Sequence, residues 1–352
     1  MEYPDFTGEY RSLMAKHLTK EVFEQLKNVS TANGFSLMDA INSGLVNPDS
    51  GIGVYAGDLA SYSCFSPLFD PIIRQYHEFS GSQLHSTNLD PAEINPDNPD
   101  PDNHYIVSTR IRVGRNLVDM PLGPAISREQ RNEVESKIVA ALTQLSGSLS
   151  GHYYPLVGMS ATVQARLIEE HFLFKAGDKY LEAAGLNRDW PSGRGIYHNE
   201  QKTFLVWVNE EDQLRIISMQ AGGNIQQVFQ RLTQALIELE RHLHFLFSPR
   251  LGYISSCPTN LGTAMRASVH IKLPNLGRNT AEFTAITAQH HLQIRGVHGE
   301  HSISEGDIYD VSNRRRLGVT EVQCVQDLYA GVVALIAKEK ELASKKNTQA
   351  TC

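Results

Sequence analysis

Arginines recur on segments whose alternating apolar and polar residues predict β-strands. The chain places them at five such positions: Arg110, Arg112, Arg215, Arg266 and Arg295. A guanidinium binds phosphate oxygens through paired hydrogen bonds and keeps its charge at physiological pH. Because the formal net charge of the chain is −7, arginines on several strands suggest a local binding site for a polyanion. Arg110 and Arg112 share one face of a strand, and for these two a pair of surface charges is an equally good interpretation.

Carboxylates and a thiol accompany these arginines. Glu211 lies in an acidic turn, Cys257 opens the segment CPTNLGTAMRASVHIKLP, and Glu300 lies in a loop that contains two glycines. Two carboxylates and a thiolate suit a cationic substrate. Solvated acids at a turn and an ordinary surface loop are the alternatives, and the pattern alone leaves them open. His171, in a mostly apolar run, is by itself more typical of a structural histidine than of a ligand.

The sequence contains none of the common phosphate-binding motifs. There is no GxxxxGK[ST] and no HRD or DFG set, so neither a P-loop nor a protein-kinase fold is indicated. Arginines would then have to bind the phosphates, with Mg²⁺ held mainly by the phosphates and water. The four cysteines form no CxxC pair, which argues against zinc and for reduced thiols. We therefore expect no metal-ligand set in the chain itself.

The bulk composition is that of an ordinary globular protein. Of 352 residues, 41% are hydrophobic and 20% are charged. The pI of about 6.1 argues against binding to nucleic acid or to an anionic membrane surface. No apolar run approaches the roughly 18 residues that span a bilayer, and no signal peptide is visible. A cytoplasmic protein is the expectation.

Strands and helices must position the residues that could do chemistry. In the segment 265–272, apolar residues alternate with Arg266, Ser268 and His270, which predicts a half-buried strand. Other segments show the same kinds of pattern. We expect further strands at 105–112, 202–209, 213–220, 292–295 and 308–311, and helices at 20–28, 128–145, 281–291 and 320–345.

A proline-rich acidic segment separates two regions of the chain. Residues 90–103 hold four prolines and few core residues, which is typical of an extended linker. We accordingly expect residues 1–90 to form a helical domain, residues 91–104 a linker, and residues 105–352 a larger domain of mixed strands and helices.

Six segments resemble the signatures of the phosphagen (guanidino) kinases. They are STRIRVGR (108–115), WPSGRGIYHNEQKTFLVWVNEED (190–212), RIISMQAGGN (215–224), CPTNLGTAMRASVHIKLP (257–274), RGVHGEH (295–301) and IYDVSNRRRLG (308–318). The resemblance extends over nearly the whole chain. It implies an α+β fold, in which a small all-helical N-terminal domain precedes a larger domain with an antiparallel β-sheet flanked by helices. It also implies reversible transfer of the γ-phosphoryl group of MgATP to a guanidino nitrogen, which gives ADP.

The resemblance implies roles for individual residues. The positions that match the family's nucleotide-binding residues are Ser108, Arg110, Arg112, His171, Arg215, Arg266, His270 and Arg295. Glu211 and Glu300 would hold the guanidinium, with Glu211 as the general base. Cys257 would contact the same guanidinium as a thiolate, tuned by the hydroxyl of Thr259. The magnesium ion would be held mainly by the nucleotide phosphates and water.

The segment DSGIGVY (49–55) resembles the short specificity loop of arginine kinases, which favours L-arginine as the substrate. The residues expected to bind its amino-acid end are Ser50, Ile52, Gly53 and Tyr55. Taurocyamine kinases share most of these motifs and are the main rival. Five positions depart from the family pattern without removing a catalytic group: Lys179, Gln213, Val297, His298 and Asp307.

Two other functions fit parts of the pattern. A catalytically silent nucleotide-binding scaffold would have no physical need for Glu211, Glu300 and Cys257. A protein-arginine kinase shares the catalytic domain, but the helical N-terminus and its DSGIGVY loop favour a free small guanidine. A monomer is the default expectation, by resemblance to arginine kinases.

Overall fold

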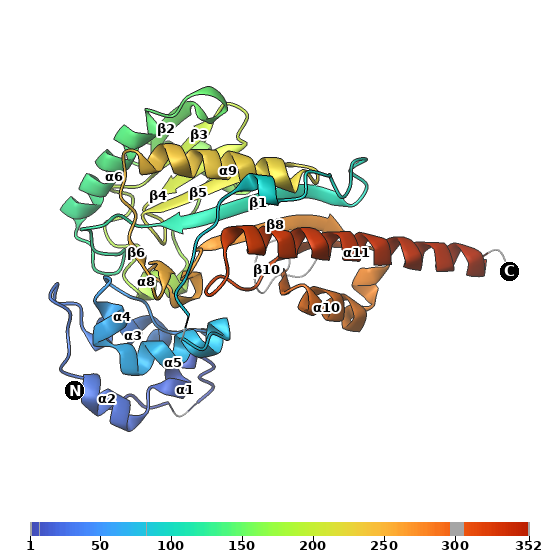
Figure 1. The fold of residues 1–352 in the computed structure, drawn as a ribbon. Coiled ribbons are helices and arrows are strands. Elements are labelled where there is room, and N and C mark those ends of the chain that lie inside the picture. Colours follow the sequence, from blue (N-terminus) through green and yellow to red (C-terminus); the bar gives the residue numbers. More distant parts are fainter. Residues whose placement is uncertain (1, 7, 82, 296–305, 351–352) are drawn as a thin grey trace. The chain divides into compact units, whose positions relative to one another are not determined.

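A computed structural model describes residues 2–6, 8–81, 83–295 and 306–350 (Figure 1). The chain divides into two compact units. The first unit comprises Met1–His85, Gly114–Ile216 and Ile237–Ala264, and the second comprises Ser86–Val113, Ile217–Leu236 and Met265–Cys352. Each unit is therefore built from stretches that are separated in sequence. The domain boundaries expected near residues 90 and 105 stay a prediction.

Short helices form the N-terminal part of the first unit, drawn in blue in Figure 1. They are α1 (Leu13–His17), α2 (Lys20–Leu26), α3 (Leu37–Val46), α4 (Ser61–Cys64) and α5 (Ser66–His77). Ser36 begins α3 with a capping box, in which its hydroxyl accepts from Asp39 N–H while the Asp39 carboxylate accepts from Ser36 N–H. Fully buried side chains such as Met14, Ile41 and Phe69 make the core of this part. The helical N-terminal domain is thus confirmed.

Eight strands form one sheet in the order β2-β3-β4-β5-β1-β8-β10-β9. In that order their bounds are Gly151–Pro155, Gly195–Asn199, Phe204–Val208, Leu214–Ala221, Ile106–Arg115, Met265–Lys272, Ile308–Asn313 and Leu292–Arg295. The pairs β2–β3, β3–β4, β1–β8, β8–β10 and β10–β9 are antiparallel. A separate ladder joins β6 (Phe247–Ser248) to β7 (Gly252–Tyr253). The α+β fold, with an antiparallel sheet in the larger domain, is confirmed.

Helices flank this sheet. They are α6 (Arg128–Leu142), α7 (Ala161–Glu169), α8 (Lys179–Ala183), α9 (Ile225–Glu240), α10 (Thr280–Gln289) and α11 (Glu321–Ala350), with 3₁₀ turns at Pro91–Glu93, Gly147–Leu149, Pro258–Asn260 and Leu276–Arg278. In the second unit, α11 packs along β8 and β10 and against α10 (Figure 1). A capping box begins α11, because Thr320 and Gln323 exchange side-chain to backbone hydrogen bonds. Among the described residues, no helix is both long and apolar enough to cross a membrane.

Strand β8 has the alternating burial that its sequence predicts. Its residues at odd positions, from Met265 to Ile271, are completely buried, whereas Arg266 and His270 are half-buried. One face of the strand therefore packs into the core of the second unit and the other presents polar side chains.

The proline-rich segment before β1 is anchored by one buried carboxylate. Asp100 is only 4% exposed. Its two oxygens accept hydrogen bonds from the backbone N–H groups of His104, Tyr105 and Ile106, at 3.1, 2.7 and 2.6 Å. These bonds satisfy the donors at which the chain enters β1.

Replacing Asp100 with Ala should lower the free energy of unfolding by about 2–3 kcal/mol, because three backbone donors, of which that of Ile106 is buried, lose a charged acceptor. Thermal unfolding followed by circular dichroism would measure the change. Asp102→Ala is the matched control, since Asp102 is exposed two residues away. Equal melting temperatures for the two variants would contradict the anchoring role.

Candidate active site

The turn between β4 and β5 carries three consecutive acids that are largely buried. The side chains of Glu210 and Glu211 are 14% and 15% exposed, and Asp212 is 2% exposed as a residue. The alternative of solvated acids is therefore excluded. Asn209 begins the turn with a positive φ of 55° and donates its backbone N–H to the Gln213 carbonyl.

A buried arginine supports this turn from behind. The Arg194 guanidinium donates hydrogen bonds of 2.7–3.1 Å to four backbone carbonyls, those of Leu186, Arg188, Ser192 and Asn209. It is completely buried, and burial lowers its pKa to about 10. Asn209 is thus fixed through its own carbonyl, which holds the acids that follow in a defined place.

Arg215, on β5, neutralises two of the three acids. Its guanidinium lies 2.9 Å from a Glu210 carboxylate oxygen and 2.9 Å from Glu211 Oε2. The other Glu211 oxygen accepts from the Asn260 side-chain amide at 3.2 Å. Arg215 is the second residue of β5. A residue so close to the hairpin turn lies beside the side chains of that turn.

Glu211 nevertheless keeps a high proton affinity. Burial raises the pKa of its carboxyl to about 7, and the charges of Asp212 and Glu210 act in the same direction against the lowering effect of Arg215. A carboxyl group with a pKa near 7 can both release and accept a proton at neutral pH. The site therefore offers a general base that is tuned by burial.

Asp212 connects the acidic turn to the segment that leads to Cys257. Its carboxylate accepts from the Asn116 amide at 2.8 Å, from the Ser255 hydroxyl at 2.6 Å and from Ser256 N–H at 2.9 Å. Asp212, the neighbour of Glu211 in the chain, therefore binds the two residues that precede Cys257. The sequence analysis gave Asp212 no role, and its only signal was its place within the motif NEED.

Cys257 is a buried thiol next to the hydroxyl of Thr259. The Cys257 sulfur lies 3.1 Å from Thr259 Oγ1, as the sequence interpretation expected. Burial and the nearby Glu211 charge raise the pKa of the thiol to about 12, while Thr259 lowers it. Burial therefore favours the protonated thiol, and a thiolate would require a cation close to the sulfur.

The glycine-containing loop after α3 packs tightly against the N-terminal helices. Gly53 has a φ of +82°, and a Cβ there would lie 2.8 Å from the Met14 Cβ. A Cβ on Gly44 would lie 2.6 Å from Gly53 Cα, and Gly44 N–H donates to the Gly53 carbonyl. The two glycines are thus required by close backbone packing. Ser50 is buried and Ile52 is half-buried in the same loop.

Tyr55 brings this loop to the thiol. Tyr55 and Cys257 share a buried cluster with Ala184 and Leu186. The next residue, Ala56, donates its N–H to the carbonyl of Ser256 at 2.8 Å. Burial, followed by the charges of Cys257 and Glu211, raises the pKa of Tyr55 well above its usual value. The structure therefore brings Tyr55, Cys257 and Glu211 together within the first unit.

The outer end of the loop is held by an ion pair. Lys179 donates to Asp49 Oδ2 at 2.6 Å, and the Tyr180 hydroxyl donates to the same oxygen at 3.1 Å. Lys179, one of the five positions that depart from the family pattern, thus pairs with Asp49 of this loop.

Four of the predicted arginines belong to the second unit and lie on one face of its strands. Arg112 of β1 stands opposite Arg266 of β8, and Ser108 stands opposite His270. His270 is in turn opposite Asp310 of β10, which is opposite Arg295 of β9. Residues directly opposite on paired strands share a face. Arg110 lies between Ser108 and Arg112 on the same face, since side chains repeat every second residue.

Asp310 is a member of this face that the sequence analysis missed. Its carboxylate lies 2.8 Å from Arg266 Nη2 and 3.7 Å from His270 Nε2. Burial alone would raise its pKa, but the hydrogen bond from His270 and the charge of Arg266 outweigh burial, so the pKa lies below its usual value. Asp310 therefore stays ionised and fixes the Arg266 guanidinium. In the sequence, the indication of a role for Asp310 was its position in the segment IYDVSN.

The remaining predicted residues are placed as follows. Arg215 lies in the first unit, apart in sequence from the four other arginines. His171 follows α7 in the first unit, is exposed and has a φ of 60°. Glu300, Val297 and His298 lie outside the described residues.

The Gln213 departure is structurally satisfied. Gln213 is 1% exposed. Its side-chain oxygen accepts from Leu117 N–H at 2.8 Å, and its amide donates to the Pro121 carbonyl at 2.9 Å. A neutral amide thus uses both of its functions in a buried place.

The Asp307 departure occurs where the backbone needs a left-handed residue. Asp307 has a φ of 60°, and Gly306 before it has the same value. Aspartate tolerates this region better than most residues, but glycine adopts it without steric cost.

Replacing Asp307 with Gly should raise the free energy of unfolding by about 0.5–1 kcal/mol, because the substitution relieves the left-handed strain. Thermal unfolding would measure the gain. Asp102→Gly, at an exposed position without a positive φ, should lower stability instead. A loss of stability in the Asp307 variant would show that the aspartate side chain does more than occupy the turn.

Comparisons with known proteins connect both units to one family. The family description "ATP:guanido phosphotransferase, C-terminal catalytic domain" matches residues 133–342, and the corresponding N-terminal domain matches residues 9–74. An arginine kinase of Anthopleura japonica is 53% identical over 342 residues, which is 96% of this chain but 48% of that relative. The chain thus spans about half the length of that protein. An arginine kinase of Penaeus vannamei is 51% identical over 334 residues, or 94% of each chain.

Solved structures give the same fold. The duplicated taurocyamine kinase of Schistosoma mansoni, with transition-state analogue components bound, is similar with a TM-score of 0.89 and 42% identity. The match covers 95% of this chain and 47% of that one. A lombricine kinase is similar with a TM-score of 0.90 and 38% identity, over 98% of this chain and 96% of the other.

Proposed function

The chain belongs to the ATP:guanido phosphotransferase family, and we propose that it transfers the γ-phosphoryl group of MgATP reversibly to the guanidino group of L-arginine. The observation that carries this proposal is the buried Glu211 carboxyl, whose pKa burial raises to about 7, and whose neighbour Asp212 binds the segment that leads to the buried thiol of Cys257. That arrangement suits a substrate which is cationic and must lose a proton as it reacts.

Glu211 supplies the base. A guanidinium is a poor nucleophile, because its lone pairs are delocalised and it is protonated. A carboxylate aligned with one of its nitrogens orients it and accepts the proton as the nitrogen–phosphorus bond forms and the bond to the ADP oxygen breaks. Arg215 and Asn260 hold the two Glu211 oxygens in place. Glu300 is proposed as the second carboxylate on the guanidinium.

Cys257 contacts the other side of the guanidinium in this proposal. A bound cation beside the sulfur offsets the burial that keeps the thiol protonated, so substrate binding favours the thiolate. The hydroxyl of Thr259, 3.1 Å away, stabilises that charge. The thiolate is therefore proposed to form with the substrate rather than before it.

The arginine face of the second unit is proposed to bind the nucleotide phosphates. Its members are Arg110, Arg112, Arg266 and Arg295. By the family resemblance, Arg215, Ser108, His171 and His270 are proposed as further nucleotide-binding residues. Fixed guanidinium groups neutralise the charge of a loose in-line transition state without reorganising. Among the described residues, no group of three or more His, Cys, Asp or Glu could hold a metal. The Mg²⁺ ion, which offsets phosphate charge when it arrives with the nucleotide, would be held mainly by the phosphates and water.

L-Arginine is favoured over other guanidines by two observations. The relatives compared above that are 51–53% identical are arginine kinases, whereas the similar taurocyamine and lombricine kinase structures are 42% and 38% identical. In addition, the short loop with Ser50, Ile52, Gly53 and Tyr55 ends at the Cys257 cluster. We propose that this loop binds the amino-acid end of arginine. Taurocyamine is the second candidate. A monomeric, cytoplasmic protein remains the expectation from the sequence.

A coupled assay for ADP formation from MgATP tests this proposal with L-arginine, taurocyamine, creatine, glycocyamine and lombricine side by side. We expect strong turnover with L-arginine alone. A preference for taurocyamine would retain the reaction and overturn the assignment of the loop. Nucleotide binding without turnover on any of the five would instead favour a silent scaffold, and equal turnover on a peptide arginine would favour a protein-arginine kinase.

The pH dependence should report Glu211. Its pKa is raised to about 7, so the ionised base is lost as the pH falls through 7, and log kcat/KM should fall with a slope of one below that value. Glu211→Gln should reduce kcat by about 10²–10⁴-fold and remove the inflexion, while nucleotide still binds. Glu238→Gln, on α9, is the control that should leave the profile unchanged. An unaltered inflexion in Glu211→Gln would assign the titration to another group.

A further inference from the structure

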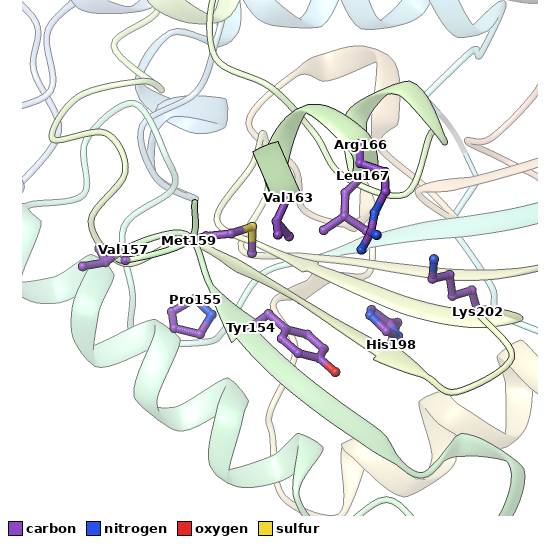
Figure 2. Close-up of a pocket in the computed structure, with 10 residues that line it drawn as sticks. Tyr154, Pro155, Val157, Met159, Val163, Arg166, Leu167, His198 and Lys202 are labelled. Carbon is purple, nitrogen blue, oxygen red and sulfur yellow. The ribbon is translucent and has the colours of Figure 1, made fainter. Parts of the chain in front are cut away.

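A cavity of about 430 Å³ lies between α7 and the strands β2 and β3, within the first unit (Figure 2). Its lining residues are Tyr154, Pro155, Val157, Gly158, Met159, Val163, Arg166, Leu167, His198 and Lys202. In the described part of the chain, none of these lining residues belongs to the candidate active site. The volume falls within the range of about 300–1,000 Å³ that is typical of small-molecule sites.

The walls of the cavity suit an apolar, planar body. Figure 2 shows Val163 and Leu167 projecting from α7 toward the strands that carry Tyr154 and His198. These two rings stack on each other, with centroids 5.0 Å apart and planes inclined by 19°. Tyr154, Val157 and Val163 are 40%, 58% and 38% exposed, so three large apolar side chains around one cavity face solvent. Such a cluster of exposed apolar surface is typical of a binding site.

The charged groups of the lining are all basic. Arg166 has no hydrogen bond or ion pair from its side chain to any described residue, and it is exposed at the cavity. Lys202 lies 3.2 Å from Glu170, which only partly satisfies its three donors, and 4.7 Å from the centre of the Phe172 ring. No Asp or Glu lines the cavity, although the whole chain has a net charge of −7. The cavity therefore favours an anion and disfavours a cationic guanidine.

We propose that this cavity binds a small aromatic carboxylate. The aromatic ring would lie against the Tyr154–His198 pair, with Val163 and Leu167 covering its other side, and the carboxylate would accept from Arg166. Offset stacking on the ring pair selects the aromatic ring of such a ligand. A bidentate guanidinium contact selects its carboxylate. The site is distinct in chemistry from that of the cationic substrate, and it does not depend on the proposed reaction.

Isothermal titration calorimetry with 2-naphthoate tests the proposal, on the full chain and in saturating MgADP so that nucleotide-binding residues are occupied. Arg166→Gln should weaken 2-naphthoate binding by about three- to tenfold, because a charged hydrogen-bonding partner is lost. Arg128→Gln is the matched control, since Arg128 is an exposed arginine on α6 that does not line the cavity. It should leave the affinity unchanged.

A neutral ligand and a second variant separate the two parts of the site. The uncharged analogue 2-naphthylmethanol should bind wild type and Arg166→Gln equally, whereas Tyr154→Ala should weaken both ligands. The proposal is overturned if Arg166→Gln and Arg128→Gln bind 2-naphthoate alike, if MgADP abolishes binding to the wild type, or if no binding is seen at millimolar 2-naphthoate.

Discussion

The burial of three consecutive carboxylates in one turn is the constraint on which the first unit depends. Water cannot solvate them there, so each must find a partner within the protein or take up a proton. Glu210 and Glu211 share the guanidinium of Arg215, and Asp212 accepts three hydrogen bonds from neutral donors. Arg194 and Asn209 are buried beside this turn and hold its backbone through hydrogen bonds to main-chain carbonyls.

The three acids have different partners, and this difference bears on the proposed role of Glu211 as a base. Asp212 accepts three hydrogen bonds, whereas Glu211 shares one cation with Glu210. Burial, together with the charges of Asp212 and Glu210, outweighs Arg215 and raises the pKa of Glu211 to about 7. Asp212 also binds Ser255 and Ser256, which directly precede Cys257, so residues with no proposed catalytic role help to position those that are proposed to meet the guanidinium.

In the second unit, the strands bring positively charged side chains together. Arg112 and Arg266 stand directly opposite each other, an arrangement that costs free energy unless negative charge lies nearby. Asp310 offsets Arg266 at 2.8 Å. A face that carries several fixed guanidinium groups is well suited to bind phosphates.

The sequence by itself determined part of the secondary structure and the identity of the chemical groups. Periodicity located several helices and strands, among them the strand 265–272, but not β2, β3, α7 or α8. Specific motifs indicated the family, because such signals are local in sequence. The motifs named Glu211 and Cys257 but not the pKa of either, since a pKa depends on burial and on charges brought from distant segments. Asp212, Arg194 and Asp310 were missed for the same reason. Only the tertiary structure decided that the acidic turn is buried rather than solvated, because burial is a property of what packs against a segment and not of the segment itself.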